Sequence, residues 1–102
     1  WQNSLKLAYV FARFRDYKYA ASLLEPFIKD KSVDEQLLFS YITICAQMPD
    51  KIKSRGFAGA MKLANEKNSK RFCNLFGEPF LSFQLLDNPF VKEEYVKANC
   101  GK

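Results

Sequence analysis

The chain has 102 residues, 48% of them hydrophobic and 26% charged, a composition that excludes intrinsic disorder and allows one domain with a buried core. Its net charge is +5, it contains no His, and no apolar run approaches the ~20 residues that a membrane-spanning helix needs. Because the sequence begins with Trp1, we expect it to be a piece of a longer protein. A missing signal peptide then says nothing about export.

The first predicted helix covers residues 4–14. Asn3 or Ser4 can serve as its N-cap, because a short polar side chain there accepts a hydrogen bond from the first turn. The predicted inner face recurs at helical spacing and consists of Leu7, Ala8, Phe11 and Phe14.

The second predicted helix begins after Asp16, whose carboxylate can cap it. Pro26 removes one backbone hydrogen bond and is expected to bend or loosen this helix near Ser22. The polar residues 30–32 close the unit. The predicted inner face consists of Tyr17, Ala20, Ala21, Leu24 and either Phe27 or Ile28.

The clearest helix is predicted over residues 34–48, and Pro49 ends it. Its apolar face is wide enough for a helix that packs on two sides, and it comprises Leu37, Leu38, Phe39, Tyr41, Ile42, Ile44, Cys45 and Met48. The opposite stripe is polar and comprises Gln36, Ser40, Thr43 and Gln47.

Ser54 is the predicted N-cap of a fourth helix. Its apolar side comprises Phe57, Ala60, Met61 and Ala64, and its other side comprises Arg55, Gly59, Lys62 and Glu66. Gly56 and Gly59 each lower the intrinsic helix stability by ~1 kcal/mol relative to Ala. We expect these glycines to let a neighbouring helix approach closely.

After residue 68 the predicted elements are short. One helix is expected over residues 70–76, ended by Gly77. Residues 80–86 alternate apolar and polar side chains, but a lone strand has no partner, so an extended or short helical packing segment is predicted. Asn88 is expected to cap a last helix that starts at Pro89, with an inner face of Val91, Tyr95 and Ala98.

The three cysteines, Cys45, Cys73 and Cys100, are an odd number without close spacing. A zinc site needs about four N or S ligands at close spacing, so no metal is predicted, and no cofactor either. Cys45 lies among apolar residues and is interpreted as a small buried side chain. Unpaired cysteines favour a reducing compartment, such as the cytoplasm.

No arrangement of catalytic residues is recognisable. The chain has no His, no Gly-rich phosphate loop, and no nucleophile beside a base. Glu93 and Glu94 are adjacent on a predicted helix and diverge by ~100°, so they cannot easily share a substrate atom. We therefore expect that the protein is not an enzyme.

The first helix pair has a pattern of large, small and aromatic residues around an Asp–Tyr turn, carried by Leu7, Ala8, Phe11, Asp16, Tyr17, Ala20, Leu24 and Phe27. This pattern resembles the tetratricopeptide repeat, a helix-turn-helix unit that stacks into an α-solenoid. Ala8 and Ala20 would let the two helices cross closely. The family usually has Trp, Ala and Pro where this chain has Ser4, Phe27 and Ser32.

A second repeat fits residues 34–67 more loosely. It places Ala60 and Ala64 in the second helix and needs an insertion around residues 50–55. Residues 69–102 do not fit the repeat.

The expected fold is therefore all-α, with antiparallel tetratricopeptide-like helix pairs over residues 1–68. Residues 69–102 form a C-terminal capping segment of the same domain, at the end of a longer array. An array's last helix pair needs its open apolar face covered. The residues predicted to cover it are Phe72, Phe76, Phe80, Leu81, Phe83, Leu85, Leu86 and Phe90.

The resemblance implies a non-catalytic scaffold that binds a protein, a peptide or a partner helix on a surface lined by first helices. One role of the family, clamping a C-terminal carboxylate, uses a Lys and an Asn that correspond here to Leu5 and Tyr9. An apolar or aromatic groove that includes Tyr9 is predicted instead. The alternative is that Tyr9 packs against a preceding repeat.

The positive charge is concentrated in residues 51–71, which contain seven basic residues and one acidic residue. Arg55 and Lys62 are the candidate partner-binding residues there. Nucleic acid or another polyanion is the alternative partner for this segment. An acidic protein partner and an ordinary solvated helix face also remain open.

Overall fold

In the computed structural model, which describes residues 1–77 and 85–100, the chain is helical and has no strand over that range. The helices are α1 (Gln2–Arg13), α2 (Tyr17–Ile28), α3 (Glu35–Cys45), α4 (Pro49–Ile52), α5 (Arg55–Lys67), α6 (Ser69–Asn74) and α8 (Pro89–Lys97), with a short 3-10 helix, η1 (Leu75–Gly77). Helices pack in sequence order: α1 with α2, α2 with α3, α3 with α5, and α5 with both α6 and α8. The all-α prediction is confirmed.

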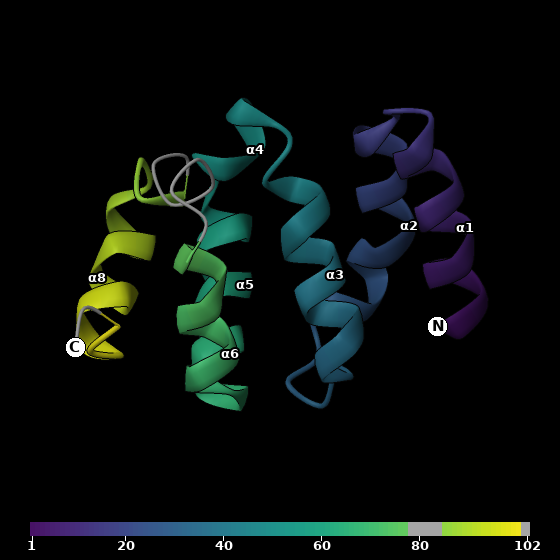
Figure 1. Ribbon diagram of the computed structural model, residues 1–102. Coiled ribbons are helices and arrows are strands. Elements are labelled where there is room, and N and C mark those ends of the chain that lie inside the picture. Colours follow the sequence, from purple (N-terminus) through teal and green to yellow (C-terminus); the bar gives the residue numbers. More distant parts are fainter. Residues whose placement is uncertain (78–84, 101–102) are drawn as a thin grey trace.

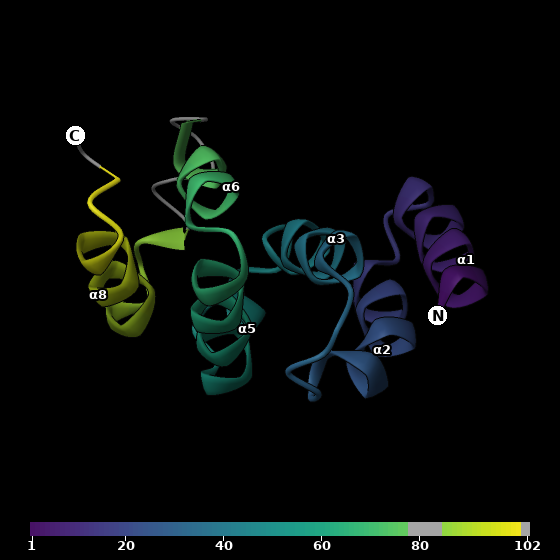
Figure 2. The same cartoon turned by 90° about the horizontal axis from the view of Figure 1, so that it is seen from below.

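The helices form two rows. The first row contains α1, α3 and α6, and the second row contains α2, α5 and α8, so the chain alternates between the rows as it advances (Figures 1 and 2). Helices α1 and α8 lie at opposite ends of a body that measures 37 × 27 × 21 Å. This sequential packing is compatible with a helical repeat.

The turn between α1 and α2 has defined capping at both ends. Arg15 is left-handed, with φ of 63°. Its N–H donates to the Ala12 carbonyl, and the Asp16 N–H donates to the Phe11 carbonyl. These two bonds form a Schellman motif, which ends α1. The Asp16 carboxylate accepts a hydrogen bond from the Tyr19 N–H at 3.2 Å, so its predicted N-cap role is confirmed.

The inner face of α1 differs from the predicted face. Leu5 and Ala8 are buried, whereas Leu7 is 44% exposed and Phe14 is 80% exposed. The prediction was therefore wrong for Leu7 and Phe14. Phe14 is exposed because the Schellman turn ends the helix before it. Leu7 is exposed because the buried face of the helix is the one that contains Leu5.

The start of α1 also differs from the prediction. The helix begins at Gln2, with Trp1 in the N-cap position and no side-chain cap. Asn3 and Ser4 therefore lie inside the helix and do not cap it.

Helix α2 matches its predicted inner face, because its buried residues are Ala20, Ala21 and Leu24. Ala8 and Ala20 are both fully buried, as expected for helices that pack closely. Pro26 lies inside α2, whose helical backbone continues to Ile28. A bend near Ser22 stays a prediction.

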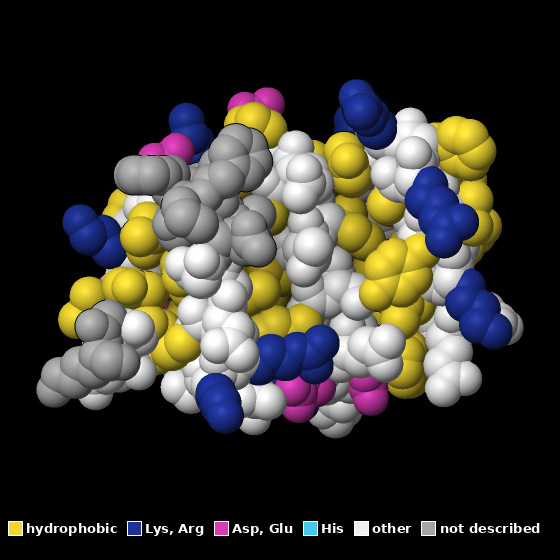
Figure 3. Space-filling model, viewed as in Figure 1, with side chains coloured by type: hydrophobic (Ala, Val, Ile, Leu, Met, Phe, Trp, Pro, Cys, Tyr) yellow, Lys and Arg dark blue, Asp and Glu magenta, His cyan; other side chains and the backbone are white. Residues whose placement is uncertain are grey.

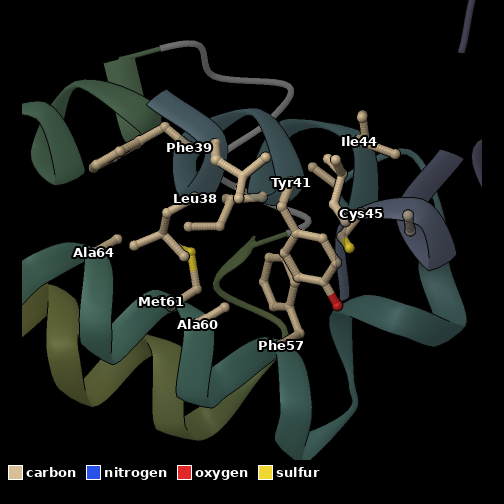
Figure 4. Close-up of a cluster of buried hydrophobic side chains, with 14 of the residues drawn as sticks. Leu38, Phe39, Tyr41, Ile44, Cys45, Phe57, Ala60, Met61 and Ala64 are labelled. Atoms are coloured by element: carbon tan, nitrogen blue, oxygen red, sulfur yellow. The ribbon is translucent and has the colours of Figure 1, made fainter. Parts of the chain in front are cut away.

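Helix α3 supplies the centre of the core (Figure 4). It packs against both α2 and α5, so its buried residues surround most of the helix and comprise Leu37, Leu38, Phe39, Ser40, Tyr41, Ile42, Ile44 and Cys45. Its predicted wide apolar face is confirmed. Ser40 was predicted on the polar stripe, but it is only 9% exposed, and its hydroxyl makes a hydrogen bond with the Tyr9 hydroxyl.

Helix α5 faces α3 with the four residues predicted for its apolar side, which are Phe57, Ala60, Met61 and Ala64 (Figure 4). The Ser54 hydroxyl accepts a hydrogen bond from the Phe57 N–H at 3.1 Å, so its N-cap role is also confirmed. The glycine prediction was wrong. A Cβ at Gly59 would meet no atom within 4 Å, and one at Gly56 would meet only the Ser54 hydroxyl at 4.0 Å, so neither glycine is needed for a close helix approach.

The segment between α3 and α5, where the predicted second repeat would need its insertion, forms α4. Helix α3 ends at Cys45, so the prediction that it continues to residue 48 and is ended by Pro49 was wrong. Pro49 is the first residue of α4. Ile52 is 2% exposed, so this short helix adds one apolar side chain to the core.

Asn88 links the C-terminal part of the chain to the rest. Its side-chain oxygen accepts hydrogen bonds from the N–H groups of Phe90 and Val91, at 2.9 and 3.4 Å, so its N-cap role is confirmed. Its amide nitrogen donates to the carbonyls of Ile52 and Ser54, at 2.9 and 3.3 Å. One side chain therefore starts α8 and fixes it to the junction of α4 and α5.

The predicted capping segment is partly visible. Phe72 and Leu85 are fully buried, and Phe76 packs at the edge of the core, but Phe90 is 57% exposed and does not cover an apolar face. Phe80, Leu81 and Phe83 lie outside the described residues. The division at residue 68 stays a prediction.

Cys73 and Cys100 form a disulfide across 27 residues of sequence. The prediction that the cysteines are unpaired was therefore wrong, and the argument for a reducing compartment loses its basis. A second Schellman motif explains how they meet: Asn99 has φ of 56°, and the N–H groups of Asn99 and Cys100 donate to the carbonyls of Val96 and Tyr95. This turn at the end of α8 brings Cys100 back to α6.

Candidate functional site

The face formed by the first row contains a groove of about 660 Å³. Helix α3 forms its floor, and α1 and α6 form its two walls. Its lining residues are Tyr9, Ala12, Tyr17, Phe39, Ser40, Thr43, Ile44, Gln47, Arg71, Asn74 and Leu75. On this face, atoms of the backbone and of side chains that are neither charged nor hydrophobic run down the middle, over α3, with hydrophobic side chains on either side (Figure 3). We call this surface the first-row groove.

Tyr9 forms the α1 wall. Its hydroxyl makes a 2.6 Å hydrogen bond with the Ser40 hydroxyl on α3, while 45% of the residue stays exposed. The hydrogen bond fixes the ring at the edge of the groove. The structure therefore places the predicted Tyr9 in a groove on the row of first helices.

Arg71 forms the α6 wall, and two contacts hold it. Its guanidinium lies 4.5 Å from the centre of the Phe39 ring, a cation–π geometry. It also donates to the Glu35 carboxylate at 3.1 Å. Asn68 donates to the same carboxylate oxygen at 2.8 Å. Arg71 is therefore a positioned cation beside an aromatic ring.

The hydrogen bond from Asn68 and that from Arg71 together lower the pKa of Glu35. Glu35 therefore stays ionised at neutral pH and keeps its bond to Arg71. The carboxylate occupies one nitrogen of the guanidinium, and a guanidinium has five N–H donors. Further donors are available to a bound group.

The floor of the groove is polar but uncharged. The Thr43 hydroxyl donates to the Phe39 carbonyl at 2.9 Å, and Thr43, Gln47 and Asn74 are exposed. Side-chain amides can both donate to and accept from a peptide backbone. The groove can therefore bind polar main-chain groups along α3 and apolar or charged side chains at its walls.

The cysteine outside the disulfide is not a candidate nucleophile. Cys45 is fully buried, and burial raises the pKa of its thiol to about 11. A nucleophilic cysteine needs a lowered pKa and access to solvent. Burial likewise raises the pKa of the neighbouring Tyr41 hydroxyl. Both side chains belong to the core (Figure 4).

Arg55 and Lys62, the other predicted site residues, lie away from Tyr9. They line a hollow of about 580 Å³ between α5 and α8, together with Phe90, Glu93 and Lys97. The structure thus brings Arg55 and Lys62 together, as their helical spacing predicts, but beside carboxylates. It does not join them to the first-row groove.

The basic segment 51–71 is partly neutralised by ion pairs. Lys51 lies 2.7 Å from the Glu25 carboxylate, and Arg71 lies 3.1 Å from that of Glu35. The seven basic residues are also divided between the two rows, because Arg71 lines the first-row groove and Arg55 lines the α5–α8 hollow. They do not form one continuous positive surface.

Sequence reasoning missed Arg71, Phe39 and Asn74 as groove residues. The polar stripe on α3 was a signal for the groove floor, since Thr43 and Gln47 were predicted to share a face. The contact between Arg71 and Phe39 had no such signal, because it depends on how α6 packs.

Within residues 1–77 and 85–100, no group of three or more His, Cys, Asp or Glu side chains could hold a metal ion. None of the helices in this range combines the length and apolar character required to cross a membrane.

In comparisons with protein-family models, curated proteins and solved structures, nothing matched this chain. The geometry of the first-row groove is therefore the main guide to function.

Proposed function

We propose that this chain is a non-catalytic interaction module that binds a peptide segment in the first-row groove. The proposal is based on the residues that form the walls and the floor of the groove. An exposed, fixed Tyr9 ring and a fixed Arg71 guanidinium face each other across uncharged polar side chains of α3. Aromatic and Arg side chains dominate binding energy at protein interfaces.

We also assign the helix pairs to the tetratricopeptide-like class. The assignment is supported by two fully buried small residues, Ala8 and Ala20, on helices that pack together. It is also supported by the alternation of the chain between two rows (Figure 2). In such stacks the first helices line the surface that binds partners, and the groove lies on this row.

The charge of the groove indicates the kind of peptide. Among the described residues that line the groove, Arg71 is the one that carries a charge. Lys6 and Arg13 share the exposed stripe of Tyr9 on α1, because they lie three residues before it and four after it. A peptide with an acidic side chain near the α6 wall and an apolar or aromatic side chain near Tyr9 would match both walls.

The experiment that tests the proposal is selection from a display library of random peptides on the immobilised chain. We expect enrichment of peptides that combine acidic and aromatic residues. Their binding should weaken at least ~10-fold, or about 1.4 kcal/mol, in Arg71→Glu and in Thr43→Arg. Thr43→Arg fills the groove floor from an exposed position and leaves the core unchanged.

Lys70→Glu is the matched control for Arg71→Glu, because Lys70 is the exposed neighbour outside the groove. Peptides that bind Lys70→Glu and the unmodified chain equally, but not Arg71→Glu, would support the proposal. Peptides that bind Thr43→Arg at full strength, or a selection that enriches no peptide, would contradict it.

Binding of nucleic acid through residues 51–71 is the alternative. The ion pair of Lys51 with Glu25 and the glutamates beside Arg55 and Lys62 weigh against it, because a phosphate would have to displace or approach carboxylates. Titration with labelled single-stranded and duplex DNA at low salt tests this alternative. Tight binding that falls with added salt and with the pair Arg55→Glu and Lys62→Glu would favour it over the peptide proposal.

A further inference from the structure

Cys73 lies within the segment that forms the α6 wall of the first-row groove. Arg71 precedes it by two residues, Asn74 and Leu75 follow it directly, and all three line the groove. Cys73 itself forms the disulfide with Cys100. The disulfide therefore attaches the middle of this wall to the segment that follows α8.

The other contacts that fix this wall are weak. Helix α6 has 6 residues, of which Phe72 is the buried one, and helices shorter than about 12 residues are marginal without support from their neighbours. The ion pair of Arg71 with Glu35 joins side chains that are 45% and 37% exposed, and exposed pairs of this kind contribute little to stability. The disulfide is therefore a major restraint on the position of α6.

Helix α8 provides a firm attachment for the disulfide. Asn88 binds it to the junction of α4 and α5, and Val91 is fully buried. Helices α6 and α8 both pack on α5, and the turn at Asn99 brings Cys100 to α6. A series of restraints thus runs from the body of the molecule through α8 and the disulfide to the groove wall.

The disulfide is open to thiol exchange, because both of its cysteines are partly exposed. One thiolate of a small dithiol attacks the disulfide to form a mixed disulfide, and the second thiolate then displaces the remaining protein sulfur. The two cysteines gain two electrons and two protons, and the dithiol leaves as its own disulfide. Cys45 does not take part, because it is fully buried and a reactive cysteine must be accessible.

We propose that the Cys73–Cys100 disulfide is a redox control of the first-row groove. In the oxidised chain it holds Arg71 in the position that binds a peptide, and reduction by a dithiol releases the α6 wall. This inference rests on the proposed peptide binding and adds its regulation. Reduction should raise the dissociation constant of a selected peptide at least ~10-fold, because Arg71 is then no longer held opposite Tyr9. Reoxidation should restore the affinity.

The test compares the oxidised chain, the chain reduced with dithiothreitol, and the variant Cys73→Ala with Cys100→Ala. Calorimetric titration measures peptide affinity, and hydrogen exchange measures the protection of each helix. In the reduced chain and in the variant, the amide hydrogens of α6 should lose their protection, whereas those of α3 should stay protected. The variant should not respond to dithiothreitol, because Cys45 is its remaining cysteine.

Ser54→Ala is the control for a general loss of stability. It removes the N-cap of α5 and leaves the disulfide intact, so it should melt at a lower temperature but bind the peptide like the unmodified chain.

Arg71→Ala shows whether reduction acts through Arg71. It should weaken peptide binding at least ~10-fold in the oxidised chain but less than ~3-fold in the reduced chain, because two changes to the same contact are not additive. Equal weakening in both forms would mean that the disulfide does not act through Arg71.

Four results would overturn the inference: α6 amides that stay protected after reduction, α3 and α6 amides that lose protection together, a peptide that binds both redox forms equally, or a Ser54→Ala chain that loses the peptide as the reduced chain does. The proposed function fails separately, if the oxidised chain binds no selected peptide. Hydrogen exchange of α6 in the two redox forms then still decides whether the disulfide holds the groove wall.

Discussion

The part of the molecule from α1 to α5 and the part from α6 to α8 are stabilised by different means. Apart from the short α4, the helices of the first part have 11 to 13 residues and share one apolar core centred on α3. In the second part α6 has 6 residues and α8 has 9. This part adds Phe72, Leu85 and Val91 to the same core, and it is also held by the Cys73–Cys100 disulfide and by the hydrogen bonds of Asn88.

Short helices in a stack therefore need other links in addition to apolar packing. A six-residue helix has less than two turns and can bury few side chains, and in α6 the one buried residue is Phe72. A disulfide constrains the unfolded chain, and a buried amide fixes position through direction-dependent bonds.

The disulfide should make the largest contribution. Replacing both partners, Cys73→Ser with Cys100→Ser, should lower the free energy of unfolding by about 2–4 kcal/mol, because the unfolded chain regains the freedom of a closed loop. Urea unfolding measures the loss. The variant should then be insensitive to a reducing agent, which should destabilise the unmodified chain by a similar amount. Equal stability of the two chains would show that apolar packing alone holds the second part.

Enlarging a small residue between α1 and α2 should have the next largest effect. Ala20 is fully buried, so Ala20→Leu should overpack the contact and cost about 1–3 kcal/mol. Lys18→Leu, at an exposed position of the same helix, is the control and should change stability by less than about 0.5 kcal/mol. If the melting temperature of Ala20→Leu equalled or exceeded that of the unmodified chain, close packing of the first helix pair would be refuted.

Asn88→Ala should cost about 1–2 kcal/mol, since it removes an N-cap and leaves backbone carbonyls without their donor. Asn88→Asp is the matched variant, because it keeps the cap acceptor and replaces the donor to Ile52 and Ser54 with a carboxylate oxygen. Chemical unfolding should place both variants below the unmodified chain. If Asn88→Asp were fully stable, the cap alone would be important and the link to α4 would not.

The smallest effect should be a gain. Gly59→Ala should stabilise the chain by about 0.5–1 kcal/mol, because Ala has the higher helix propensity and the added methyl group meets open space. Gly56→Ala is the companion variant and should behave in the same way. A destabilised Gly59→Ala in thermal melts would show that a neighbouring helix does need the glycine.

Local features of the fold were predictable from the sequence. The caps Asp16, Ser54 and Asn88 each accept hydrogen bonds from N–H groups within three residues. The chemistry of the side chain and its position before an apolar pattern are therefore sufficient to predict each cap. The inner face of α5 was predictable for a similar reason, because helical spacing alone assigns residues to a face. The exposed Leu7 and Phe14 were not, because α1 carries apolar side chains on more than one face, and the buried face is the one that contains Leu5 and Ala8.

Features that join distant residues were not predictable. Tyr9 was proposed for the site, but its partner Ser40 lies 31 residues away, and Arg71 meets Glu35 across 36 residues. Such contacts depend on how far each helix is displaced along its neighbour, which helical spacing does not determine. The disulfide was not predictable for the same reason, since the turn at Asn99 had to be known before Cys100 could be placed beside α6.

The order in which the helices pack also has a consequence for the kinetics of folding. Because each helix packs on its neighbours in the chain, most contacts join residues that are close in sequence. Chains of this kind fold in microseconds to milliseconds, since little loop entropy is lost before contacts form. Opening from either end would leave α3 covered on both sides, and we therefore expect the amide hydrogens of α3 to exchange last.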